Sequence, residues 1–155
     1  MSKEKTPKTI VCAVRGQPVS RRTVTRAIDL ALEHNARLIF MLVVAAEFMG
    51  QVTPAMVSLR AVYEQLWDLG EFTMLILCDR AERRGVEQVE WIIRKGDIRE
   101  QIVDYVKEIH PDVLVLGLPL PDFSRSVFTP DEFDEFVRRI EKEVGIEVVQ
   151  VRPAA

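Results

Sequence analysis

The sequence lacks the features that mark nucleic-acid-binding and membrane-spanning proteins. Its 155 residues carry 21 Lys and Arg against 24 Asp and Glu, so there is no basic excess for binding nucleic acid. No apolar run approaches the ~18 residues of a membrane span. Residues 1–8 are polar and rich in lysine, without the apolar segment of a signal peptide. We therefore expect a flexible tail over residues 1–8, a cytoplasmic location, no nucleic-acid partner and no membrane association.

Cysteine and histidine are equally scarce. Cys12 and Cys78 are far apart and lie in apolar surroundings, so we expect two reduced core thiols rather than a disulfide or a metal site. His34 and His110 lie at predicted helix ends, with no nucleophile or metal partner nearby in the sequence. The sequence therefore predicts no catalytic residue and no metal site, and we do not expect an enzyme.

What the sequence does contain is a strict alternation of strand and helix patterns from residue 9 to residue 152. Short apolar or β-branched runs predict buried strands, and apolar residues at helical spacing predict helices between them. The predicted strands are Thr9–Val14, Arg37–Val44, Val86–Arg94, Val113–Leu116 and Ile146–Val151. This alternation indicates a single α/β domain, a three-layer α/β/α sandwich around a five-stranded parallel sheet.

Two of the predicted helices begin at clear capping signals. Asp97 and Glu100 form a D-x-x-E capping box, and Thr129, followed by proline and Glu132, forms another. Gly145 ends the last helix.

A longer helix is predicted from Thr53-Pro54 to Arg84. Gly70 interrupts it and marks either a bend or a close contact. Its apolar stripe is expected to consist of Leu59, Tyr63, Leu66, Thr73, Leu77 and Ala81.

The stretch from Pro111 to Pro130 is the first candidate for a binding site. Gly117 ends a fully apolar strand, and the residues after it are rich in proline and serine, which predicts a loop. Ligands of open α/β sheets bind outside the carboxyl ends of the strands, where the strand order reverses. A small molecule bound by this chain would therefore contact this loop.

The order of these residues resembles the universal stress protein family over nearly the whole chain. The run from Ile10 to Ser20 is similar to the family's first strand, which ends in V-D-G-S and a later serine. Gly96 to Ile102 is similar to its G-D-x-x-x-x-I segment, and Pro111 to Gly117 to its D-L-I-V-M-G segment. The resemblance implies a Rossmann-like fold of the adenine nucleotide alpha hydrolase type, with strand order 3-2-1-4-5. It also implies a role in stress response or regulation.

Nucleotide-binding members of that family hold phosphates with a glycine motif, G-x-x-G, followed further on by G-S or G-T. In this sequence Gly117 matches the first glycine, but Leu120 stands at the second. Pro130 and Asp131 stand at the closing pair, and Arg15 replaces the aspartate that contacts the nucleotide. One position of the motif therefore survives.

The chemistry of the replacements agrees with a lost phosphate loop. Pro119, Pro121 and Pro130 have no N–H to donate, and Leu120 does not adopt positive φ as readily as glycine. Four carboxylates within residues 131–135 occupy the positive end of the last helix dipole. We therefore expect no ATP binding in the family's usual mode, and no cofactor.

Alternatives remain at this site. A nucleotide (ATP or AMP) or another anion, if bound in a divergent loop, would contact Arg15, Gly16, Val44, Gly117, Ser124 and Ser126. Arg15, with Arg21, Arg22 and Arg125, would either bind such an anion or pair with the carboxylates of residues 131–135. A weak hydrolase on the same fold is the third possibility, although no nucleophile or base pair is visible.

Two further features point to protein contacts. The phenylalanines of Phe123–Phe136 are either a packed cover over the ligand cleft or an interface. Ile146–Val151 is the edge strand of the expected topology, and the resemblance implies that it pairs across a two-fold axis. We expect a homodimer through this strand, a regulatory module that acts by contacting an unknown protein partner.

Overall fold

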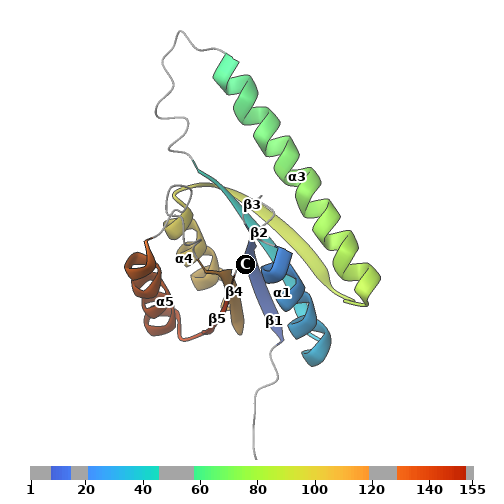
Figure 1. Cartoon of the computed structure of the whole chain (residues 1–155), viewed down its shortest axis with the longest axis vertical. Helices are drawn as coiled ribbons and strands as arrows, with labels where there is room; N and C mark the ends of the chain where they lie inside the picture. The colour runs from blue at the N-terminus through green and yellow to red at the C-terminus, as the bar shows by residue number, and fades with distance from the viewer. Residues whose placement is uncertain (1–7, 15–20, 46–57, 119–128, 153–155) are drawn as a thin grey trace, which may run out of the picture.

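The structure, a computed structural model, describes residues 8–14, 21–45, 58–118 and 129–152. Its centre is a five-stranded sheet in the order β3-β2-β1-β4-β5, with every neighbouring pair parallel (Figure 1). The strands are β1 (Thr9–Val14), β2 (Arg37–Ala45), β3 (Val89–Gly96), β4 (Val113–Gly117) and β5 (Glu147–Val151). The helices are α1 (Arg21–His34), α3 (Ser58–Arg84), α4 (Ile98–Ile109) and α5 (Pro130–Val144). The predicted sheet and strand order are confirmed.

Alternate residues of the strands divide between two hydrophobic cores. Phe40 and Val115 lie in the core that α1 and α3 cover. Ile39 and Leu114, their neighbours in the sequence, lie in the core that α4 and α5 cover. The central strands are therefore buried on both faces, which explains why their sequences are apolar without alternation.

The third strand begins later than its sequence predicted. We expected a strand from Val86, but β3 begins at Val89. The amide of Val86 instead donates to the carbonyl of Ala81 at 3.0 Å, and Gly85 has φ +110°, so both residues close the end of α3. The prediction that this strand is less covered is confirmed, since β3 is an edge strand and Trp91 is 37% exposed.

The predicted helix ends are confirmed. The carboxylate of Asp97 accepts from the amide of Glu100 at 3.1 Å, and the hydroxyl of Thr129 accepts from the amide of Glu132 at 3.3 Å. Gly145 ends α5 in the left-handed conformation, with φ 74°. These caps fix where α4 and α5 begin relative to the sheet.

Helix α3 packs closely on the sheet at Gly70. A Cβ atom at this residue would lie 2.9 Å from a methyl group of Leu42, so Gly70 marks a close contact within a continuous helix. The part of α3 before this contact projects beyond the sheet (Figure 1). The predicted cap at Thr53-Pro54 lies outside the described residues.

The buried side of α3 differs from the predicted stripe. Ala81 is buried and Leu77 packs against the core as predicted, but Met74 and Cys78 are buried as well, and Leu66 is 43% exposed. Sequence periodicity misplaced this side because apolar residues lie on more than one side of the helix.

Asp112 joins the amino ends of β1 and β4. Its carboxylate accepts from the amides of Lys8 and Thr9, each at 2.9 Å. The remainder of the predicted tail, residues 1–7, lies outside the described residues.

Both cysteines lie in the core under α1 and α3, as predicted. Burial raises the pKa of Cys78 to about 11 and raises the pKa of the fully buried Cys12 as well. In the part of the chain that the structure describes, no helix is long and apolar enough to cross a bilayer.

Candidate functional site

The candidate site lies at the carboxyl ends of the central strands. Strand β1 lies between β2 and β4, so the strand order reverses there. Val44 is the last residue but one of β2, and Gly117 is the last residue of β4. Both are half-buried and lie on the face covered by α1 and α3. From the strand register, these two residues are about 12 Å apart across β1. The other four predicted contact residues, Arg15, Gly16, Ser124 and Ser126, lie outside the described residues.

Packing against α1 offers a reason why residue 117 is glycine. A Cβ atom at this position would lie 2.8 Å from the hydroxyl oxygen of Thr23 on α1. Thr23 is 3% exposed and is the one polar residue that is fully buried among the described residues. The close approach of α1 to the end of β4 therefore favours glycine here, whether or not a ligand binds.

The amino end of α5 is occupied by its own side chains. Thr129 caps the helix, and Asp131 and Glu132 lie in its first turn. The carboxylate of Glu132 accepts from the guanidinium of Arg99 at 2.6 Å. A phosphate approaching this turn would meet two carboxylates and an amide already bonded to Thr129.

Among the described residues, the arginines considered in the sequence analysis do not pair with the first turn of α5. Arg21 and Arg22 are exposed at the start of α1, and Arg15 and Arg125 lie outside the described residues. The partner of Glu132 is Arg99, which the sequence analysis did not consider. Both residues follow capping residues at the starts of α4 and α5, and this shared position was the signal that could have found them.

The phenylalanines of α5 belong to the core rather than to a cover or an interface. Phe133 is 2% exposed and Phe136 is 4% exposed, and both pack in the core under α4 and α5. Phe123 and Phe128, the other two phenylalanines of this segment, lie outside the described residues. The richness in phenylalanine therefore reflects, for these two residues, the packing of α5 on the sheet.

A comparison with family models assigns the chain. The model described as "Universal stress protein family" matches residues 6–119, well over half of the sequence. The chain belongs to the universal stress protein family. A search of curated proteins finds no match.

Solved universal stress proteins share the fold of this chain. The universal stress protein UspA from Lactobacillus plantarum superposes with a TM-score of 0.71 at 20% identity, covering 94% of this chain and 97% of its own. A universal stress protein family protein from Arabidopsis thaliana with AMP bound superposes with a TM-score of 0.57 at 20% identity, covering 96% of this chain and 94% of its own. The universal stress protein from Archaeoglobus fulgidus in complex with dAMP superposes with a TM-score of 0.60 at 15% identity, covering 93% of this chain and 97% of its own. At these identities the likeness establishes the fold.

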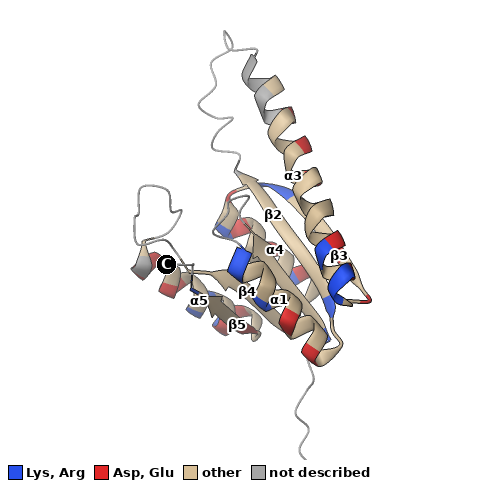
Figure 2. Ribbon diagram, turned by 45° about the vertical axis from the view of Figure 1, so that its right-hand side comes forward, with Lys and Arg blue, Asp and Glu red and all other residues tan. Residues whose placement is uncertain are grey.

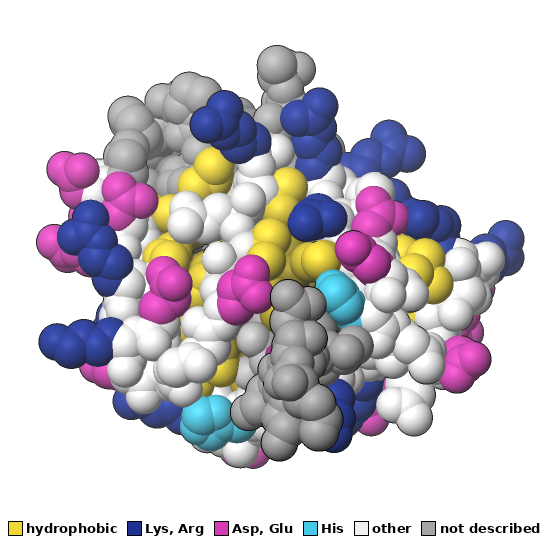
Figure 3. Space-filling model, turned by 90° about the horizontal axis from the view of Figure 1, so that it is seen from below, with side chains coloured by type: hydrophobic (Ala, Val, Ile, Leu, Met, Phe, Trp, Pro, Cys, Tyr) yellow, Lys and Arg dark blue, Asp and Glu magenta, His cyan; other side chains and the backbone are white. Residues whose placement is uncertain are grey.

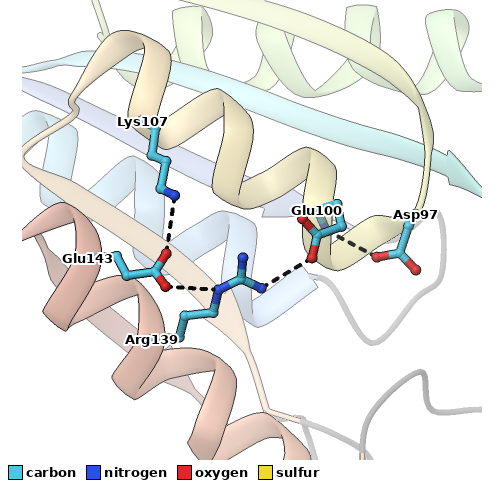
Figure 4. A network of polar contacts seen from close by, with 5 residues as sticks. All are labelled: Asp97, Glu100, Lys107, Arg139 and Glu143. Carbon is cyan, nitrogen blue, oxygen red and sulfur yellow. Dashed lines mark hydrogen bonds and ion pairs between the residues drawn. The ribbon is translucent and has the colours of Figure 1, made fainter.

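In this universal stress protein an ion-pair network joins α4 to α5 (Figure 4). Glu143 accepts from Lys107 at 3.2 Å and from Arg139 at 3.4 Å, and Arg139 also contacts Glu100 at 3.2 Å. The hydrogen bond from Lys107 is the main cause that lowers the pKa of Glu143, and the hydrogen bond to Glu100 is the main cause that raises the pKa of Arg139. The network runs along α4 from Glu100 in its first turn to Lys107 in its last turn, and its members are partly exposed, so we expect it to contribute little to stability.

Both histidines lie at the other end of the sheet. His34 precedes β2 and His110 precedes β4, so both are at amino ends of strands, where they appear as two separate patches in the view from below (Figure 3). Within residues 8–14, 21–45, 58–118 and 129–152, no group of three His, Cys, Asp or Glu side chains is placed to hold a metal ion.

Proposed function

We propose that this universal stress protein is a regulatory module without enzymatic activity that does not bind ATP in the family's usual mode and acts through protein contacts. The observation that supports the proposal is the closed amino end of α5, with its Thr129 cap and the Glu132–Arg99 ion pair. This turn is where the family's phosphate-binding motif ends. A polyphosphate there needs free amides and a positive field.

The surviving glycine of the motif does not argue against this proposal. The close contact with Thr23 favours glycine at residue 117, which offers a reason for its presence without a ligand. Neither the histidines nor the two cysteines offer a reactive group at the carboxyl ends of the central strands. The histidines lie at the other end of the sheet, and the thiols are buried.

Binding of a nucleoside monophosphate is the second candidate. Relatives of the same fold have been solved with AMP and with dAMP. Val44 and Gly117 border one edge of the sheet on the same face, at a separation of about 12 Å that a nucleoside can span. Such a ligand would use this edge without placing a phosphate chain on α5.

Two measurements on the purified protein separate the candidates. Mass spectrometry of the denatured protein would detect AMP or ATP that was carried through purification. A ligand present at 100 times its dissociation constant adds about 2.7 kcal/mol to the free energy of unfolding, which raises the melting temperature by about 5–10 °C. The proposal predicts no carried nucleotide and no such shift with ATP and Mg²⁺, whereas a shift with AMP alone favours the second candidate.

A variant locates any nucleotide that does bind. Val44→Glu places a carboxylate at the half-buried end of β2 and should abolish a shift caused by binding at this edge. Glu135→Gln, on the exposed side of α5, is the matched control and should leave the shift unchanged. A shift that survives Val44→Glu would place the ligand elsewhere.

The proposed homodimer uses the outer edge of β5. The amide of Glu147 donates to Asp112, and the carbonyl of Val151 accepts from Leu118, so alternate residues bond to β4. In a parallel pair the residues between them, Val148 and Gln150, point their N–H and C=O groups outward. Two copies paired antiparallel through these groups would satisfy both edges.

Proline substitution tests this contact selectively. Gln150→Pro removes an outward N–H without removing a bond to β4, whereas Gln150→Ala keeps the N–H. We expect light scattering to show that Gln150→Pro loses this contact and Gln150→Ala retains it. An assembly unaffected by Gln150→Pro would contradict pairing through β5.

A further inference from the structure

Strand β3 has a neighbouring strand on one side only among the described residues. Its eight residues pair with β2 in one continuous register, and the sheet order places β3 at the margin opposite β5 (Figure 2). Edge strands of soluble proteins are commonly short, bulged or interrupted by proline, which keeps other strands from pairing with them. The sequence of β3 contains no proline and its register has no bulge. Nothing in the strand itself therefore prevents a further strand from pairing with it.

The register shows which backbone groups of β3 face outward. The amide of Leu38 donates to the carbonyl of Gln88 at 2.9 Å, and Leu38 pairs with Val89. In a parallel pair the residues on either side of the paired residue make the bonds, so the even-numbered residues of β3 bond to β2. The N–H and C=O groups of Val89, Trp91 and Ile93 therefore point away from β2. An extended backbone is the partner that satisfies a row of such groups.

A groove of about 480 Å³ lies beside this edge. Its lining is mainly apolar and aromatic: Ile39, Val89, Glu90, Trp91, Ile92 and Tyr105. Ile39, Ile92 and Tyr105 belong to the side of the sheet that α4 covers. A strand paired with β3 would place alternate side chains on this side, so the side chain opposite Ile92 would lie over the groove. An apolar residue suits that position.

The charges on either side of Ile92 keep capacity for a further partner. Both bonds that Arg37 donates to Glu90 go to one carboxylate oxygen, Oε2, and the side chain of Glu90 is 53% exposed. Arg94 donates to Glu108 at 2.5 Å through Nη2, one of the three nitrogens of a group with five N–H donors. A cation opposite Glu90 and a carboxylate opposite Arg94 would therefore extend the existing ion pairs without breaking them.

We propose that β3 binds an extended segment of another protein, which adds a further strand antiparallel to it. From its amino end the segment carries an acidic residue opposite Arg94, an apolar residue opposite Ile92 and a basic residue opposite Glu90, with one residue between each. In an antiparallel pair these are the positions whose side chains lie closest across the strands. The inference rests on the proposed function, a module that acts through protein contacts, and identifies the surface that makes them.

A strand of another protein fits this edge better than a second copy of the chain. β3 itself carries the pattern, from Glu90 to Arg94, so two copies could pair here. Pairing through both β3 and β5 would, however, join opposite margins of each sheet, and the assembly would continue from copy to copy without closing. A strand of another protein ends at β3 and leaves the proposed β5 dimer finite.

Two synthetic peptides test the charge pattern. The peptide T-E-T-V-T-R-T carries the proposed pattern, and T-T-E-V-R-T-T has the same composition with its charges moved to the other side of the strand. We expect the first to cause saturable shifts of the amide signals of Val89, Trp91 and Ile93 in the ¹⁵N-labelled full chain. It should bind about tenfold more tightly than the second, because it forms two opposite-charge pairs across the strands. The signals of Val148 and Gln150, at the other margin of the sheet, should not move.

Proline substitution locates the peptide on β3. Trp91→Pro removes one outward N–H without removing a bond to β2, whereas Trp91→Ala loses the same ring and keeps the N–H. Both variants should keep the circular dichroism of the unmodified chain, and only Trp91→Pro should lose peptide binding. If Trp91→Pro does not fold, the comparison of the two peptides on the unmodified chain decides.

Three results would overturn the proposal. They are equal binding of the two peptides, binding that survives Trp91→Pro, and a lower mass of folded Trp91→Pro in light scattering, which would show that a second copy occupies β3. A shift with ATP would contradict the proposed function but would leave the peptide result unchanged, so the two failures are distinguishable.

Discussion

Gly117→Ala tests whether the surviving glycine of the phosphate motif serves packing. The added Cβ would lie 2.8 Å from the Thr23 hydroxyl, against 3.4 Å for ordinary contact, so atoms must move apart by about 0.6 Å. Thr23 is buried at the start of α1 and cannot turn into solvent. Overpacking of this kind costs about 1–3 kcal/mol. We therefore expect Gly117→Ala to lower the melting temperature by about 2–4 °C for each kcal/mol.

A double-mutant cycle isolates the contact. Thr23→Ala removes the hydroxyl, after which the nearest atom to the new Cβ is the Cβ of residue 23, at 3.9 Å. In the Thr23→Ala background, Gly117→Ala should leave the free energy of unfolding unchanged, or should raise it slightly because alanine restricts the unfolded chain. Urea unfolding of the four proteins measures the coupling free energy, which we expect to exceed about 1 kcal/mol. An equal cost of Gly117→Ala in both backgrounds would refute the packing argument.

Three further predictions concern the ends and surfaces of the helices. Thr129→Ala removes the cap of α5 and should cost about 1 kcal/mol in urea unfolding, whereas Thr129→Ser should cost little. Cys12 and Cys78 should react slowly with a thiol reagent at pH 8 in the folded protein and rapidly in urea, because burial raises the pKa of both thiols and keeps them protonated. The pKa of Glu143 is lowered in the folded protein, so its contribution to stability is present above the ordinary carboxyl pKa and is lost as the pH falls through the lowered value. Lys107→Met should therefore reduce the loss of stability in acid, and an unchanged pH profile would count against the ion pair.

Much of the fold could be predicted because local and overall patterns agree. The buried strands read as apolar runs, and the capping residues Asp97 and Thr129 stand where α4 and α5 begin. The predicted start of β3 was wrong because Val86 suits a strand as well as it suits the turn that closes α3. Local sequence cannot distinguish these two uses of a β-branched residue.

The candidate site was harder to predict because its contacts join distant segments. Nothing in the sequence pairs Arg99 with Glu132 until α4 and α5 are known to begin side by side. The steric reason for Gly117 likewise depends on where α1 crosses the end of β4. The buried side of α3 was predicted only in part, since periodicity alone does not show which side meets the sheet.

The central claim is that the amino end of α5 and the end of β4 do not hold a polyphosphate. Titration of ¹⁵N-labelled protein with ATP and Mg²⁺, followed through the backbone amide signals of Gly117 and residues 131–133, tests this most directly. We predict that these signals do not move at millimolar ATP. Saturable shifts of Gly117 together with the first turn of α5 would contradict the claim.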